Sequence, residues 1–175
     1  MKSLASGIVS CTAALLCALT VQGAEVIWLE AEQFDSSGGW KNDPQLIDQM
    51  GSPYLLAVGI GTPVADAETA IEIPVSGTYR LWARTKDWAP RFHPGTFQVG
   101  INGTIVDHVF GRHGETKWKW EDGGQVTLAA GKTQLKLHDR TGYYGRCDAI
   151  VLTSNLQWKP PETVEEIARL REKYG

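Results

Sequence analysis

The chain has 175 residues, enough for one domain with short flanking segments, and its formal net charge is −3. A mildly acidic chain lacks the concentrated positive charge that binds nucleic acid, so we exclude nucleic acid as a partner. The sequence contains seven tryptophans. This is more than a core of this size normally needs, which favours stacking of some rings on a ligand.

Residues 1–24 have the pattern of a secretory signal peptide. Lys2 supplies the positive charge, an apolar run extends from Ile8 to Leu19, and Val21 to Ala24 offers small residues for cleavage. The run is too short to span a membrane, and no other stretch is long enough. We therefore expect a secreted or periplasmic protein. Cys147, the one cysteine left after cleavage, has no disulfide partner within the chain and is expected to be buried.

Residues 25–155 contain short apolar or alternating segments separated by turn signals, which is the pattern of successive strands. The expected strands are 25–34, 54–58, 67–73, 78–86, 96–101, 104–110, 116–121, 125–129, 132–139 and 147–153. In 78–86, odd-numbered and even-numbered side chains should face opposite sides. Residues 40–53 look irregular, and Asp122-Gly123-Gly124 is predicted to be a turn. This spacing is typical of an all-β sandwich or barrel.

Residues 156–175 form a different kind of segment. Pro160-Pro161 predicts a stiff linker, and Thr163 with Glu166 forms a capping box. The residues that follow have helical spacing, which predicts an amphipathic helix. Two alternatives are open: the helix packs on the sandwich, or it leads into a further domain.

Five segments, taken in order, carry a family resemblance over most of residues 26–153. They are Trp28–Glu32, Pro74–Arg84, Val99–Gly103, Val126–Leu137 and Asp148–Leu152. Together they resemble the galactose-binding-like β-sandwich of carbohydrate-binding modules of families six and thirty-five. The resemblance implies an all-β jelly-roll sandwich with a short C-terminal helix, acting as a secreted, non-catalytic carbohydrate-binding module.

The tail resembles the segment that joins such a module to a flavin-dependent oxidoreductase domain in some large secreted bacterial proteins. A catalytic domain in cis, either such an oxidoreductase or a polysaccharide lyase, is therefore a possible partner. Flavin binding by this chain itself is not expected. Its Gly59-Ile60-Gly61-Thr62 lacks the third glycine of the dinucleotide fingerprint and precedes Pro63 rather than a helix.

The resemblance also implies a structural calcium ion held by Glu30 and Glu32 near the first strand and by Asp148 at the last strand. A hard cation prefers several oxygen ligands, which carboxylates and backbone carbonyls supply. The alternative is that the two glutamates are ordinary solvent-facing residues and that Asp148 pairs with a lysine or an arginine.

The remaining candidates are aromatic and polar residues that could bind a polysaccharide or an oligosaccharide. The apolar face of a sugar packs on an aromatic ring, and its hydroxyls need polar partners at the ring edge. The candidate ligand-binding residues are Trp40, Trp88, His93, Trp120, Asp139, Tyr143, Tyr144 and Arg146. Trp118 and Trp120 share a strand face, so one of the two is expected in the core, and Trp28 and Trp82 are assigned to structure.

Two other functions are considered. In one, the domain is a structural module whose aromatic residues anchor it to a catalytic domain. In the other, His138 and Asp139 act with Tyr143 and Arg146 as the base and charge neutraliser of a small lyase. The four histidines lack the spacing of a zinc site.

Overall fold

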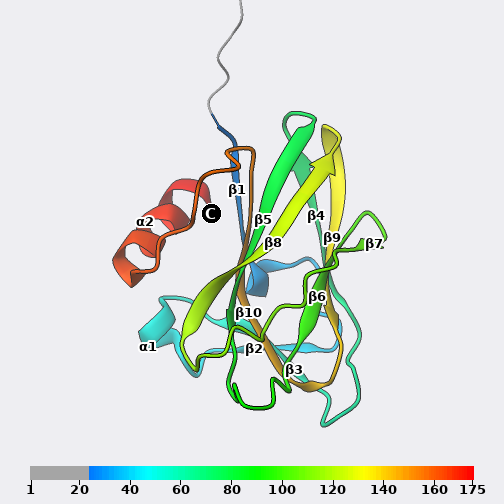
Figure 1. Cartoon of the computed structure of the whole chain (residues 1–175), viewed down its shortest axis with the longest axis vertical. Helices are drawn as coiled ribbons and strands as arrows, with labels where there is room; N and C mark the ends of the chain where they lie inside the picture. Colours follow the sequence, from blue (N-terminus) through cyan, green and yellow to red (C-terminus); the bar gives the residue numbers. More distant parts are fainter. Residues whose placement is uncertain (1–23) are drawn as a thin grey trace, which may run out of the picture.

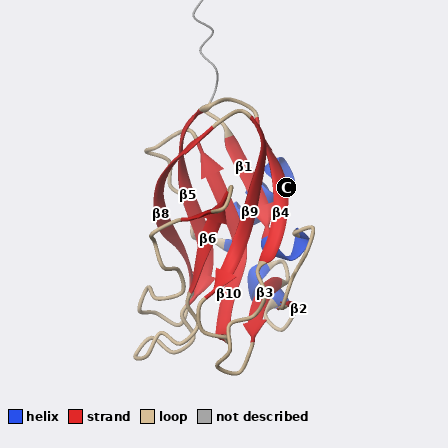
Figure 2. Ribbon diagram, turned by 90° about the vertical axis from the view of Figure 1, so that its right-hand side faces the viewer, coloured by secondary structure: helices blue, strands red, loops and turns tan. Residues whose placement is uncertain are grey.

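The structure, a computed structural model, describes residues 24–175, so nearly all of the predicted signal peptide lies outside the described residues. Two antiparallel sheets pack face to face as a sandwich, and a helix lies outside it (Figures 1 and 2). This architecture confirms the prediction of an all-β sandwich with a short C-terminal helix. No helix in the described part of the chain is long and apolar enough to cross a membrane.

The larger sheet has the order β2-β3-β10-β5-β8, with β1 also paired to β10. Its strands are β1 (Val26–Glu30), β2 (Trp40–Asp43), β3 (Tyr54–Val58), β5 (Gly77–Lys86), β8 (Trp118–Leu128) and β10 (Tyr143–Thr153). The smaller sheet has the order β4-β9-β6-β7. Its strands are β4 (Ala67–Ile73), β6 (Phe97–Ile101), β7 (Thr104–Ile105) and β9 (Gly131–Asp139). The helical segments are η1 (Ala31–Gln33), α1 (Ile47–Met50) and α2 (Val164–Tyr174).

The core between the sheets follows from the two-residue period of the strands. Tyr79 and Leu81 of β5 face this core, whereas Trp82 faces the outer side of the larger sheet, as the alternation predicts. Cys147 of β10 is fully buried in the same core, which was expected. Burial raises the pKa of its thiol well above the usual value, so the thiol remains protonated and unreactive.

Five local predictions were wrong. The strand expected over 25–34 ends at Glu30 and is followed by η1, and the strand expected over 147–153 already begins at Tyr143. Residues 40–53 contain β2 and α1, and the strand expected over 104–110 ends at Ile105. Asp122-Gly123-Gly124 does not turn the chain but lies inside β8, where the pairing with β5 shifts register between Leu81 and Trp82. Gly124 takes up this bulge with a positive φ of 87°.

Helix α2 covers the outer face of the larger sheet (Figure 1). Its buried Ile167 joins a second apolar cluster with Trp28, Trp82 and Trp120 of the sheet. The predicted capping box is present, because the Thr163 hydroxyl accepts a hydrogen bond from the Glu166 amide at 3.3 Å. The segment predicted as a linker and helix therefore packs on the sandwich. The further domain beyond the helix stays a prediction.

Candidate functional site

Three loops meet at one end of the sandwich. They comprise residues 59–66, 87–96 and 140–142, together with the first residues of β10. Two glycines allow the close approach. A Cβ on Gly142 would lie 2.1 Å from the Thr62 carbonyl oxygen, and a Cβ on Gly95 would lie 2.8 Å from those of Tyr143 and Tyr144. The loops are therefore packed backbone to backbone, which fixes the side chains that they carry.

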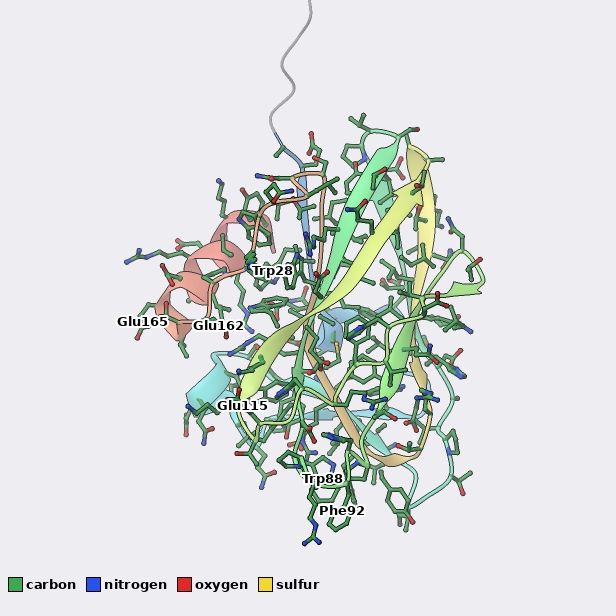
Figure 3. All side chains as sticks on the ribbon, in the orientation of Figure 1. Trp28, Trp88, Phe92, Glu115, Glu162 and Glu165 are labelled. Carbon is green, nitrogen blue, oxygen red and sulfur yellow. The ribbon has the colours of Figure 1, made fainter. Side chains whose placement is uncertain are left out.

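The surface formed by Ile60, Trp88, Phe92 and Tyr143, which we call the loop-end surface, is apolar and open to solvent. The exposed fractions are 78% for Ile60, 74% for Phe92, 45% for Tyr143 and 37% for Trp88. Figure 3 shows Trp88 and Phe92 together at the lower end of the molecule in this view. Exposed large apolar side chains gathered in one place are typical of a binding site.

Contacts behind this surface fix its rings. The Trp88 Nε1 atom donates a hydrogen bond to the Tyr143 carbonyl oxygen at 3.1 Å, and the Trp88 and Tyr144 rings meet edge to face at 5.6 Å. The Arg146 guanidinium lies over the Trp88 ring, 5.8 Å from its centroid, and its Nη1 donates to the Tyr144 carbonyl oxygen at 2.8 Å. Trp88, Tyr143, Tyr144 and Arg146 are thus brought together, as a common ligand site requires.

Backbone strain concentrates in these loops. Among the described residues, four that are not glycine have a positive φ, and three of them are Ile60 at 50°, His93 at 46° and Tyr144 at 62°. A β-branched residue such as Ile60 strongly disfavours this conformation. Strained residues are common where a side chain must be presented to a ligand.

Asp87, which is 1% exposed, organises the loop that carries Trp88. Its Oδ2 lies 2.6 Å from the Nδ1 atom of His93 and accepts a hydrogen bond from the Gly114 amide at 3.0 Å. His93 is therefore next to the candidate site, but its Nδ1 atom is bonded to Asp87 and holds the loop of residues 87–96 in place.

A polar pocket adjoins this loop. It is lined by Asp107, His108, Val109, Arg112, His113 and Glu121. His113 connects it to the loop by accepting a hydrogen bond from the Asp87 amide at 3.2 Å. Burial opposes ionisation of Glu121. The His108 Nε2 atom, 3.5 Å from Glu121 Oε2, and hydrogen bonds from the Thr85 hydroxyl and the Gly111 amide outweigh it and lower the pKa of this carboxyl. Glu121 therefore stays a charged acceptor. The sequence did not indicate this pocket, because only the folding of residues 107–113 against β8 brings their polar side chains to Glu121.

Three of the predicted ligand-binding residues do not lie at this surface. Trp40 is 1% exposed and packs edge to face on Phe97 in the main core. Trp120 is 8% exposed, and its Nε1 donates to the Pro161 carbonyl oxygen at 2.9 Å beneath the C-terminal segment. Asp139 is 1% exposed and accepts hydrogen bonds from the backbone amides of Val64, Thr141 and Gly142. These three residues build the fold and present nothing to a ligand.

The lyase-like group considered from the sequence is not assembled. His138 pairs with Asp66 at 2.8 Å, whereas the neighbouring Asp139 is buried on the opposite side of β9. Neither side chain contacts Tyr143 or Arg146, so the predicted base and neutraliser do not meet.

The residues expected to bind calcium lie close together but are paired with arginines. Asp148 accepts hydrogen bonds from Arg84 Nη1 at 2.8 Å and from Arg171 Nη2 at 3.0 Å, and Glu30 accepts from Arg171 Nε at 2.7 Å. Burial raises the pKa of Glu30, although Arg171 acts in the opposite direction, and burial raises the pKa of Glu32 to about 7. No group of three or more His, Cys, Asp or Glu side chains in the described part of the chain is arranged to hold a metal ion. These residues are paired with arginines and therefore do not fit the calcium site that the resemblance implied. Asp148 is paired as in the alternative, whereas Glu30 is 6% exposed and is not the solvent-facing residue that the alternative expected.

Comparison with solved structures identifies relatives of this fold. A family 35 carbohydrate-binding module from Clostridium thermocellum matches with a TM-score of 0.58 and 18% identity, over 73% of this chain and 98% of that one. The C-terminal family 6 module of LamC, a marine laminarinase from Zobellia galactanivorans, matches with a TM-score of 0.58 and 20% identity, over 74% of this chain and 100% of that one. The chain has the fold of these carbohydrate-binding modules.

A third similar structure is a larger enzyme. It is the GH26-CBM35 β-(1,4)-mannanase of Podospora anserina, with a TM-score of 0.59 and 22% identity. The match covers 77% of this chain but only 29% of the mannanase. No protein-family model matches the chain, and no curated protein matches it in sequence. At these identities the likeness establishes the fold alone.

Proposed function

We propose that this chain is a secreted, non-catalytic carbohydrate-binding module that binds a polysaccharide or an oligosaccharide on the loop-end surface. The observation that carries the proposal is the exposure of Trp88 and Tyr143 at one end of the sandwich, where the Trp88 indole is hydrogen-bonded to the Tyr143 carbonyl oxygen and the supporting loops are packed backbone to backbone. A pre-ordered ring loses little conformational entropy when a sugar stacks on it. The fold shared with carbohydrate-binding modules supports the same function by analogy.

Polar groups for the sugar hydroxyls lie beside these rings. Arg146 lies against Trp88 and is only partly buried, and its guanidinium carries five N–H donors of which one is bonded to the Tyr144 carbonyl oxygen. Glu121, in the adjoining pocket, supplies a charged acceptor. One or two stacked sugars bury little area, so we expect a dissociation constant in the micromolar to millimolar range.

The proposal also concerns the context of the chain. With the signal peptide removed, the module would act outside the cytoplasm and serve a catalytic domain in cis, by analogy with the mannanase that contains a family 35 module. The module would keep that domain near its polymeric substrate by raising the effective concentration of substrate.

A glycan array and an affinity-gel screen of residues 25–175 test the proposal. The panel should contain neutral and acidic polysaccharides, each with calcium and with a chelator. We expect binding to at least one glycan that falls about tenfold or more in Trp88→Ala and in Tyr143→Ala, since about 1.4 kcal/mol corresponds to tenfold. Unchanged binding in both variants contradicts the site assignment.

Val75→Ala is a useful control, because Val75 is 37% exposed, as Trp88 is, and lies in the turn between β4 and β5, outside the three site loops. Its binding should equal that of the wild type.

A second candidate function is an interaction module that packs on a partner domain. The exposure of the aliphatic Ile60 favours it, because a branched aliphatic side chain is a poor platform for a sugar but a common interface anchor. Folded protein that binds no glycan in a broad panel would select this function over carbohydrate binding.

A further inference from the structure

The side chain of Arg171 in α2 contacts three separate elements of the sandwich. Its Nε donates to Glu30 Oε1 of β1 at 2.7 Å, and its Nη1 donates to the Met50 carbonyl oxygen of α1 at 2.6 Å. Its Nη2 lies 3.0 Å from both carboxylate oxygens of Asp148 in β10. One planar guanidinium therefore satisfies acceptors that come from positions far apart in the sequence.

These contacts are largely shielded from water. The exposed side-chain fraction is 14% for Arg171, 5% for Glu30 and 0% for Asp148. Buried carboxylates need a nearby positive charge, because removing one partner leaves an uncompensated charge in a low dielectric. Asp148 has a second cation, Arg84, at 2.8 Å, whereas Arg171 is the one ion-pair partner of Glu30 within residues 24–175.

The acceptor oxygens are of the kind that a divalent cation binds, but the described side chains supply too few of them for a calcium site. Two carboxylates and a backbone carbonyl are the oxygen ligands that Ca²⁺ prefers, and they converge on one point. At that point the structure has the Arg171 guanidinium, whose fork of N–H donors matches carboxylate geometry. The same position cannot contain both cations.

We propose that Arg171 is the internal counter-ion of this carboxylate cluster and takes the position that a divalent cation would otherwise fill. The positive charge thus comes from a side chain of the protein itself, the Arg171 guanidinium on α2. It follows that the domain needs no divalent cation for stability. It also follows that α2 is fastened to the sandwich by charge as well as by the apolar contact of Ile167.

Thermal unfolding of the full chain tests this proposal. The wild type should give the same melting temperature, within about 1 °C, in millimolar EDTA and in millimolar calcium. Arg171→Met should melt roughly 10 °C lower in EDTA, because the buried Glu30 then has no positively charged partner. Arg169→Met is the matched control: Arg169 lies on the same helix, is exposed and carries the same charge, so its melting temperature should change by no more than about 2 °C.

A charge-rescue variant separates the ionic role of Arg171 from packing. Glu30→Gln keeps an oxygen that can accept the hydrogen bond from Trp28 Nε1 but removes the negative charge. In Glu30→Gln/Arg171→Met we therefore expect at least half of the loss in melting temperature to be recovered, or folding to be restored if the single variant does not fold.

Three results would overturn the proposal. The first is a wild-type melting temperature that falls on chelation and recovers with calcium, since a metal would then supply the charge. The second is an Arg171→Met variant as stable as Arg169→Met. The third is a double variant with no recovery, which would make Arg171 a packing residue.

Discussion

The loop-end surface and the face beneath α2 are both rich in aromatic rings, yet one is open and the other covered. Trp28, Trp82 and Trp120 beneath α2 are 4%, 7% and 8% exposed, whereas Trp88 at the loop end is 37% exposed. Both Trp88 and Trp120 donate their indole N–H to a backbone carbonyl. The difference is that the acceptor for Trp120 belongs to a segment that also covers its ring, while the acceptor for Trp88 lies behind the ring and leaves it accessible. Exposure therefore depends on how later segments pack and not on residue type.

The largest expected loss of stability comes from replacing a covered tryptophan with alanine, compared with the same replacement of an exposed one. Trp120→Ala should lower the free energy of unfolding by about 3–5 kcal/mol, because it leaves a cavity between the sheet and the C-terminal segment. Trp88→Ala should lower it by no more than about 1 kcal/mol, since the ring is already partly in water. Urea unfolding followed by fluorescence measures both, and equal losses would remove the distinction between the two regions.

A pair of substitutions on α2 tests whether the cover is integral to the domain. Ile167→Ala should cost about 2–4 kcal/mol, because its side chain is fully buried among the tryptophans of the sheet. Val164→Ala on the same helix should cost less than about 1 kcal/mol, since Val164 is 40% exposed. If the two variants unfold at the same urea concentration, α2 does not stabilise the sandwich.

Glu32 gives the covered region a pH dependence. Burial raises the pKa of its carboxyl from 4.5 to about 7, so the folded state favours the protonated form. Protonated Glu32 therefore contributes its full share to the free energy of unfolding below about pH 4.5. This contribution is lost as the pH rises through about 7. After discounting for partial exposure, Glu32→Gln should be more stable than the wild type by about 1 kcal/mol at pH 8 and equal to it at pH 4.

Melting temperatures between pH 4 and 8 in EDTA measure this effect. Parallel curves for Glu32→Gln and the wild type would contradict it.

The smallest effect concerns the start of α2. Thr163→Ala removes the hydroxyl that accepts from the Glu166 amide and should cost about 1 kcal/mol. Thr163→Ser keeps the hydroxyl and should stay within a few tenths of a kcal/mol of the wild type. Denaturant midpoints distinguish the two, and a loss shared by both variants would assign the effect to the methyl group.

The strands were predictable from the sequence because alternation and turn residues are local signals. Residues 54–58 and 67–73 form strands at the expected positions, and Tyr79 and Trp82 face opposite sides of β5 as expected. The interior of β8 was not predictable. A glycine pair usually marks a turn, and only pairing with β5 makes it a bulge within one long strand.

The candidate site was predictable in part. Trp88 and Tyr143 were indicated because both were expected in loops between strands. Tyr143 is instead the first residue of β10, but the structure does bring the two residues together. Trp40 and Asp139 were not distinguishable from them, because the packing of Trp40 on Phe97 and the hydrogen bond from the distant Val64 amide to Asp139 depend on tertiary contacts. The pairing of Asp148 was left open for the same reason: Arg171 reaches it only after α2 has folded back.

The position of β10 in the larger sheet has a consequence for the order of folding. This strand pairs with β1, β3 and β5, yet it is the last of the ten strands to be synthesised. Until residue 153 has been synthesised, β1, β3 and β5 lack the strand that lies between them. The larger sheet therefore cannot form completely on a nascent chain. Such distant pairings slow folding to the millisecond-to-second range. During that interval the apolar edges need protection from aggregation, and a truncation before Tyr143 should leave an insoluble chain rather than a smaller domain.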